Sequence, residues 1–158
     1  DRLDRLEAGG LAVIDYKTGS PSVGGWLGER PDDPQLPLYA LAAGDEVKAV
    51  AFACLRKGER GFTGLAREEG LLKGVGTVDK HRSAGKLHAS WGELTAAWRE
   101  ATARLAAEFA AGHAPVDPKK RFASCKWCEL GALCRIRERA VAEDAEDDDA
   151  AAADGGEA

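Results

Sequence analysis

The 158-residue sequence contains no methionine and no long apolar segment. None of its apolar runs approaches the roughly 20 residues that a helix needs to cross a bilayer, and no secretory signal pattern is present. These absences exclude a membrane-spanning helix and favour a cytoplasmic protein without a membrane partner. Because the chain lacks methionine and begins at Asp1 within a segment that reads as a strand, we expect the N-terminal part of its domain to be missing.

Basic residues are absent from the last 18 positions, which changes the meaning of the net charge of −5. Residues 141–158 hold eight acids, and removing their charges from the total leaves +3 for residues 1–140. A mildly basic body permits a nucleic-acid partner. We expect residues 1–140 to form one domain and the acidic tail at 141–158 to be disordered, since it has almost nothing to bury.

Cysteine is scarce, and its four positions are uneven. Cys125, Cys128 and Cys134 follow the spacing C-x2-C-x5-C, which favours a metal site over disulfides in a chain without secretory features. Zinc sites and [4Fe–4S] clusters both usually need four ligands. Cys54 is the remaining thiol, but it lies in an apolar segment and is expected in the core.

Hydrophobic periodicity predicts an α/β domain. Residues 1–7 and 11–17 read as two strands joined by a glycine-rich turn, and the second is apolar on both faces, as in the centre of a covered sheet. Residues 35–43 read as a helix with an apolar stripe of Leu38, Leu41 and Ala42.

The second half of the predicted domain has one strong helix signal. Residues 47–56 read as a third strand, and residues 62–66 as a returning fourth. Residues 67–90 show no sustained period. A helix is predicted over 91–112, with Ser90 as its N-cap, Glu93 completing a capping box, and an apolar side that reaches Phe109.

An acid and a lysine share one face of the second strand. Asp15 and Lys17 lie two residues apart, so their side chains point the same way. The hairpin brings Asp1 or Asp4 beside Asp15, and either would supply the second carboxylate that a Mg²⁺ site needs. Taken alone, Asp15 and Lys17 are better explained as a surface ion pair worth about 0–1 kcal/mol.

Three sequence motifs, in their order along the chain, together resemble the nuclease domain of the PD-(D/E)XK superfamily. The resemblance is in particular to the RecB/AddB type of bacterial double-strand-break repair nuclease. The motifs are Asp-Arg-Leu-Asp-Arg-Leu-Glu, Val-Ile-Asp-Tyr-Lys-Thr-Gly and Gln-Leu-Pro-Leu-Tyr-Ala. The resemblance covers residues 1–43 and returns over 122–135. It implies a restriction-endonuclease-like central mixed sheet flanked by helices.

The resemblance also implies roles for individual residues. Asp1, Asp15 and the carbonyl of Tyr16 would hold Mg²⁺, Lys17 would be the catalytic lysine, and Asp4 is the alternative first ligand. Gln35 and Tyr39, spaced i and i+4 on one helix face, would match the Gln-x-x-x-Tyr motif that supports the site and the DNA strand. A metal-binding histidine of the family would lie before Asp1.

In related nucleases the C-terminal cysteine triplet joins a fourth, upstream cysteine to hold a [4Fe–4S] cluster. The resemblance therefore implies such a cluster on Cys125, Cys128 and Cys134, with the fourth cysteine outside this chain and Zn²⁺ as the alternative. The surrounding basic side chains would contact DNA phosphates, or else form a solvated surface. They are Lys119, Lys120, Arg121, Lys126 and Arg135.

The whole pattern predicts a Mg²⁺-dependent DNA nuclease domain of a bacterial recombination-repair helicase–nuclease. The helicase would belong to the same full-length chain or to a partner subunit. Two alternatives stay open. One is a catalytically silent DNA-binding scaffold whose fold is held together by a bound metal, and the other is a stand-alone exonuclease of the CRISPR-associated type.

Overall fold

The computed structural model describes residues 1–56 and 58–136 of the chain. The chain divides into two compact units, Asp1–Gly112 and His113–Ala158. The predicted acidic tail at 141–158 lies outside the described residues. In the part of the chain that the structure describes, no helix is long and apolar enough to cross a membrane.

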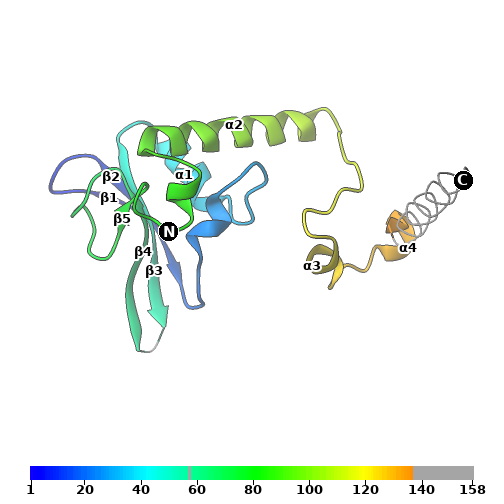
Figure 1. Cartoon of the computed structure of the whole chain (residues 1–158), viewed down its shortest axis with the longest axis horizontal. Helices are drawn as coiled ribbons and strands as arrows, with labels where there is room; N and C mark the ends of the chain where they lie inside the picture. The colour runs from blue at the N-terminus through cyan, green and yellow to red at the C-terminus, as the bar shows by residue number, and fades with distance from the viewer. Residues whose placement is uncertain (57, 137–158) are drawn as a thin grey trace, which may run out of the picture. The chain divides into compact units, whose positions relative to one another are not determined.

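The first unit is built on a mixed sheet with flanking helices, so the predicted α/β class and restriction-endonuclease-like architecture are confirmed (Figure 1). Its strands lie in the order β1-β2-β3-β4-β5. Neighbouring pairs alternate between antiparallel and parallel, beginning with antiparallel β1 and β2. The strands are β1 (Arg2–Arg5), β2 (Leu11–Lys17), β3 (Val47–Arg56), β4 (Glu59–Ala66) and β5 (Gly76–Thr77).

Strand β2 lies between β1 and β3, as its apolar character on both faces predicts. Its parallel pairing with β3 requires a crossover, which contains a short 3-10 helix, η1 (Val23–Trp26), and α1 (Gln35–Ala43). Side chains alternate across β2, so Val13 packs on the helix side of the sheet and Ile14 on the opposite side. The crossover therefore returns α1 to the face that also carries Asp15 and Lys17.

Aromatic residues fill the core between the sheet and the helices. Trp26 is fully buried, with its ring centroid 4.8 Å from that of Phe52. Trp98, on α2 (Trp91–Ala110), donates its indole N–H to the carbonyl of Trp26 at 2.9 Å. Burying a large apolar side chain contributes about 1.5–3 kcal/mol, so this cluster fixes the crossover against the sheet.

Small side chains form most of the opposite face of the sheet. Ala49, Ala51 and Ala53 of β3 are buried there, with Val75 packed over the same cluster. Gly64 of β4 faces Ala51 in register, and a Cβ at Gly64 would lie 2.1 Å from the carbonyl oxygen of Val50. Glycine at this position is therefore required by the closeness of β3 and β4.

The predicted inward stripe of α1 is wrong. The helix buries Leu36, Pro37 and Ala40, whereas Leu38 is exposed. Nearly every residue of α1 is apolar, so its sequence has little contrast between faces, and the packing of Trp26 and α2 decides which face is buried. Leu41 is half-buried and Ala42 is exposed.

The predicted N-cap of α2 is confirmed, whereas Glu93 bonds the residue before the cap and not Ser90 itself. The Ser90 hydroxyl accepts the backbone N–H of Glu93 at 3.2 Å, and the Glu93 carboxylate accepts the N–H of Ala89 at 2.7 Å. The helix ends at Ala110, and Gly112 follows with a φ of 71°. The predicted apolar stripe stops earlier than expected, because Phe109 is 87% exposed.

Three further segments differ from, or add to, the predicted elements. Strand β4 begins at Glu59 and not at residue 62. The unassigned stretch 67–90 contains β5 and a 3-10 helix, η2 (Ala84–Lys86). In the second unit, the cysteine segment forms two short helices, α3 (Arg121–Cys125) and α4 (Gly131–Cys134).

Candidate active site

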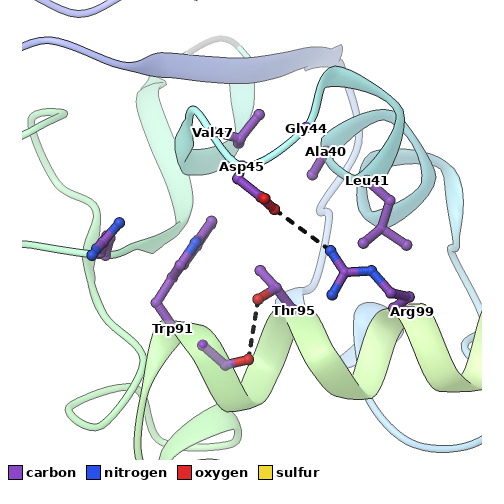
Figure 2. A pocket seen from close by; sticks show the side chains of 10 residues that line it. Ala40, Leu41, Gly44, Asp45, Val47, Trp91, Thr95 and Arg99 are labelled. Carbon is purple, nitrogen blue, oxygen red and sulfur yellow. Dashed lines mark hydrogen bonds and ion pairs between the residues drawn. The ribbon is translucent and has the colours of Figure 1, made fainter.

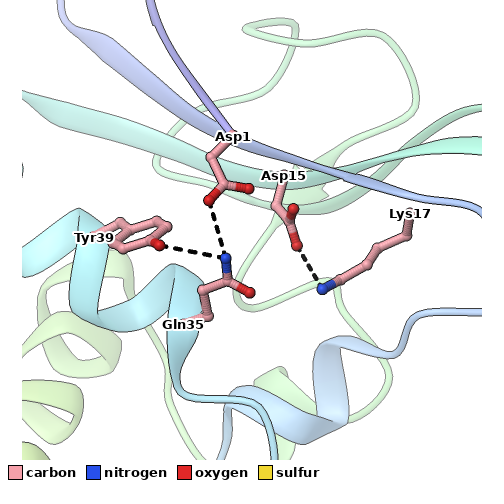
Figure 3. A network of polar contacts seen from close by, with 5 residues as sticks. All are labelled: Asp1, Asp15, Lys17, Gln35 and Tyr39. Carbon is pink, nitrogen blue, oxygen red and sulfur yellow. Dashed lines mark hydrogen bonds and ion pairs between the residues drawn. The ribbon is translucent and has the colours of Figure 1, made fainter.

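Asp15 and Lys17 form an ion pair at the C-terminal end of β2 (Figure 3). Lys17 Nζ lies 2.7 Å from Asp15 Oδ2, and the Asp15 side chain is only 7% exposed. Apart from this ammonium, the buried Oδ2 has no hydrogen-bonding partner among the described residues. Burying a carboxylate costs free energy unless strong partners compensate its charge. The Asp15 carboxylate could therefore bind a cation in addition to Lys17.

The Lys17 ammonium is stabilised by its acidic surroundings. Its pKa is raised above the ordinary lysine value, chiefly by the hydrogen-bonding contact with Asp15, against desolvation that lowers it. The charges of Asp15 and Asp33 add to the increase. Lys17 therefore stays protonated at neutral pH, where it donates hydrogen bonds and does not act as a base. The stabilisation is present at neutral pH and is lost as the pH rises through this raised pKa.

The hairpin brings a second carboxylate to Asp15. Arg2 pairs with Ile14 across the antiparallel strands, so continuing the register by one residue sets Asp1 opposite Asp15. Side chains directly opposite one another on such a pair have Cβ atoms about 4.5–5.5 Å apart. Two carboxylates at this separation repel, and a shared cation would relieve the repulsion.

The first turns of α1 contact the same corner. The Gln35 side-chain amide donates to Asp1 Oδ2 at 3.1 Å, and the same Nε2 lies 3.4 Å from the Tyr39 hydroxyl (Figure 3). The i, i+4 spacing therefore aligns both side chains toward the strand end. Gln35 orients the Asp1 carboxylate directly, whereas Tyr39 acts on it through Gln35.

The structure does not bring Asp4 to this corner. Asp4 pairs with Ala12 in the register, so its side chain lies on the sheet face opposite Asp15. It forms an ion pair with Arg2 on that face. Of the two candidate first ligands, only Asp1 therefore shares a face with Asp15 and Lys17.

The Tyr16 side chain is exposed on the other face, but its backbone points to the open edge beside Asp1. The N–H of Leu11 donates to Glu46 on the β3 side at 2.8 Å. Backbone directions alternate along a strand, so the groups of Tyr16 point toward the β1 side. The pairing of β2 with β1 ends at Ile14, which leaves the Tyr16 carbonyl beyond the last paired residue.

These residues fit a divalent cation of the magnesium type. Two carboxylates and a main-chain carbonyl are hard oxygen ligands, and Mg²⁺ commonly takes one or two carboxylates and keeps several waters. Within the described residues, no three Asp, Glu, His or Cys side chains are grouped closely enough to hold a metal. The corner at Asp1 and Asp15 thus offers a two-carboxylate site, which needs water and substrate oxygens to complete it.

A separate hollow lies at the C-terminal end of α1 (Figure 2). Its lining does not include Asp1, Asp15, Lys17, Gln35 or Tyr39. It has a volume of about 290 Å³ and includes Trp91 and Thr95 in its lining. Arg99 crosses it to reach Asp45, with 3.6 Å between the charged atoms. Both partners are largely exposed, so the pair contributes little to stability.

The three clustered cysteines are not gathered into a metal-binding group in the described residues. Cys125 and Cys134 are half-buried and Cys128 is exposed. Cys54, in the first unit, is half-buried at the edge of the core and contacts the Thr63 hydroxyl at 3.9 Å. This agrees with the expectation that Cys54 belongs to the core region.

The basic residues predicted to contact DNA lie in the second unit. Lys119, Lys120, Lys126 and Arg135 are exposed, and Arg121 is the first residue of α3. Lys126 Nζ lies 5.0 Å from the ring centroid of Trp127, which is 84% exposed. An exposed indole beside an ammonium presents both a stacking surface and a charge to solvent.

Sequence reasoning missed two residues near the corner formed by Asp1, Asp15 and Lys17, namely Phe52 and Asp33. Phe52 faces Asp15 in the parallel register, and its ring centroid lies 5.6 Å from Lys17 Nζ. Asp33 adds to the raised Lys17 pKa. A Gln-x-x-x-Tyr motif can be recognised in the sequence. The contact of Phe52 with Lys17, 35 positions earlier, depends on how β3 pairs with β2 and cannot be read from a local motif.

Comparison with known proteins identifies the family. No curated protein and no solved structure matches the chain. The family model of the PD-(D/E)XK nuclease superfamily matches residues 1–135, which include the sheet, both long helices and the cysteine segment. The chain therefore belongs to the PD-(D/E)XK nuclease superfamily.

Proposed function

We propose that this protein hydrolyses DNA phosphodiester bonds with Mg²⁺ at the corner formed by Asp1, Asp15 and Lys17. Membership of the superfamily supports nuclease activity in general. The observation that carries the specific proposal is that Asp15 and Lys17 share one sheet face with Asp1 across the hairpin. In the part of the chain that the structure describes, the buried Asp15 Oδ2 has Lys17 as its one partner.

Each residue has a distinct part in the proposed reaction. Asp1, Asp15 and the Tyr16 carbonyl would hold Mg²⁺, which supplies a polarised phosphate and an acidified water when bound. Lys17, as an ammonium, orients the attacking water and stabilises negative charge in the transition state. Gln35 holds Asp1 in its orientation through the 3.1 Å hydrogen bond, with Tyr39 beside it.

Substitutions at the ion pair test this proposal. Lys17→Ala and Asp15→Ala should each remove cleavage of DNA, with a loss of at least about 10²–10³-fold in kcat for the electrostatic contribution of Lys17 alone. Asp4→Ala is the matched control, because it removes an acid from the other sheet face. Circular dichroism should show all three variants folded.

Wild-type cleavage in both active-site variants would refute the proposal. DNA binding without any cleavage by the wild-type protein, at every divalent cation tested, would support a silent DNA-binding scaffold in its place. Measuring binding and cleavage on the same labelled duplex separates these outcomes.

We further propose a RecB/AddB-like setting, in which this domain is the nuclease of a cytoplasmic double-strand-break repair machine with a helicase region or subunit. The support is the ordered motif set together with the C-x2-C-x5-C spacing. Cleavage that becomes processive and ATP-dependent in the full-length protein would support this setting. ATP-independent cleavage by a full-length protein without a helicase region would favour a stand-alone exonuclease.

The cysteine segment is proposed to bind a [4Fe–4S] cluster through Cys125, Cys128 and Cys134, with a fourth cysteine from outside this chain. Its support is the spacing, since four cysteine thiolates hold a [4Fe–4S] cluster and this segment supplies three of them. Iron and sulfide assays of anaerobically purified full-length protein test it. A colourless protein that contains zinc would replace the cluster with a zinc site.

The same segment carries the proposed phosphate contacts, at Lys119, Lys120, Arg121, Lys126 and Arg135. Five cations within 17 residues would bind a DNA backbone without reading its sequence. Their removal should weaken DNA binding and reduce its dependence on salt. Unchanged binding would mark these residues as a solvated surface.

A further inference from the structure

The aromatic ring of Phe52 lies beside Asp15 and Lys17 in the proposed catalytic corner. The Phe52 side chain is fully buried in β3, directly opposite Asp15 in the parallel register with β2. The ring centroid lies 5.6 Å from Lys17 Nζ, within the distance at which an ammonium is attracted to the face of an aromatic ring. Lys17 is therefore bounded by a carboxylate on one side and by a π-system on another.

The Phe52 ring is held in place by other aromatic residues of the core. Trp26 packs against Phe52 with the ring planes inclined by 41°. Trp98 meets Trp26 edge to face, at 6.4 Å and 85°, while its indole N–H donates to the Trp26 carbonyl. The position of the Phe52 ring is thus set by the core and does not depend on Lys17.

Lysine needs such a partner more than most side chains. Ordering its long, flexible side chain loses more rotamer entropy than ordering most other side chains does. The Asp15 carboxylate also contacts Lys17, and a cation held at the same carboxylate would repel the ammonium. An aromatic face attracts the ammonium without competing for the carboxylate oxygens.

We propose that Phe52 is a positioning residue, which holds the Lys17 ammonium beside Asp15 through its ring face in addition to its packing in the core. The inference rests on the proposed role of Lys17 in cleavage. It assigns a function to the aromatic ring that a leucine of similar volume would not perform.

A fluorination series at position 52 tests the electrostatic part of this role. Replacing Phe52 by mono-, di- and trifluorinated phenylalanine nearly keeps its shape while weakening the negative face of the ring. We expect kcat to fall stepwise, by about fivefold at the trifluorinated ring, with KM for DNA little changed. The same series at Phe62, a half-buried phenylalanine on the other face of the sheet, should leave kcat unchanged.

A second measurement does not depend on cleavage. The Cε protons of Lys17 should show an upfield ring-current shift in the NMR spectrum of the folded protein, and Phe52→Leu should remove it. If the wild-type protein shows the shift but cuts no DNA, the proposed function fails while the contact stands. A kcat that stays flat across the series in an active protein, or an absent ring-current shift, would overturn the positioning role.

Discussion

The proposed catalytic corner, formed by Asp1, Asp15 and Lys17, and the cysteine segment around Cys125, Cys128 and Cys134 carry equally clear sequence motifs, but they are built in different ways. The corner is assembled by a hairpin register, a parallel strand pair and the start of α1, all backed by a buried aromatic core. The cysteine segment consists of two helices of five and four residues with exposed Trp127, Leu130 and Leu133. A site built on a sheet is shaped by the fold alone, whereas a thiolate site commonly takes its shape from the bound metal.

The largest expected effect is a difference in the free energy of unfolding between a tryptophan variant in the core of the first unit and one in the cysteine segment. Trp26→Ala should lower the free energy of unfolding by about 3–5 kcal/mol, because it removes a fully buried ring from the core. Trp127→Ala should change it by less than about 0.5 kcal/mol, since this side chain is mostly exposed. Urea unfolding followed by tryptophan fluorescence and circular dichroism measures both values. Equal destabilisation by the two variants would remove the distinction between the regions.

Removing the cluster or zinc proposed for the cysteine segment should loosen that segment and leave residues 1–112 folded. In full-length protein that holds the proposed centre, trypsin should cut slowly after Lys119, Lys120 and Lys126, and severalfold faster once the cluster or zinc has been removed. The β-sheet and helices of residues 1–112 should resist cleavage in both states. Cys128→Ser should imitate metal removal, whereas Cys54→Ser should not. Unchanged cleavage after proven loss of the metal would show that the segment is ordered without it.

The smallest expected difference compares serine hydroxyls in the two regions. Ser90→Ala removes the N-cap of the 20-residue helix α2 and should cost about 1 kcal/mol, seen as a lower Tm. Ser124→Ala removes a long 3.4 Å contact with the Lys120 N–H in the short helix α3. It should leave the Tm of the main transition unchanged. A larger loss from Ser124→Ala would indicate that the second unit contributes to the stability of the first.

The sequence predicts the first region well because its signals are local. The bounds of β2, α1 and β3 follow from apolar runs and turn residues, and the shared face of Asp15 and Lys17 follows from strand alternation. The choice between Asp1 and Asp4 required the hairpin register, which the turn length alone left open.

Other features were beyond local signals. Trp26 lies in a stretch rich in glycine and proline, and nothing in that stretch indicates that it forms the centre of the core. The buried face of α1 was predicted wrongly because the helix is apolar all round. The contact of Phe52 with Lys17 depends on the pairing of β2 with β3 across a 29-residue connection, so periodicity cannot reveal it.

The most direct test of the account is the binding of a divalent cation to the catalytic corner, measured without DNA by calorimetric titration of Mn²⁺ as a probe for Mg²⁺. We expect Asp1→Asn and Asp15→Asn each to weaken Mn²⁺ binding by at least about tenfold, since each removes a charged oxygen ligand. Asp4→Asn, on the opposite sheet face, should bind like the wild-type protein. Wild-type affinity in Asp15→Asn would contradict the assignment of this corner as the metal site.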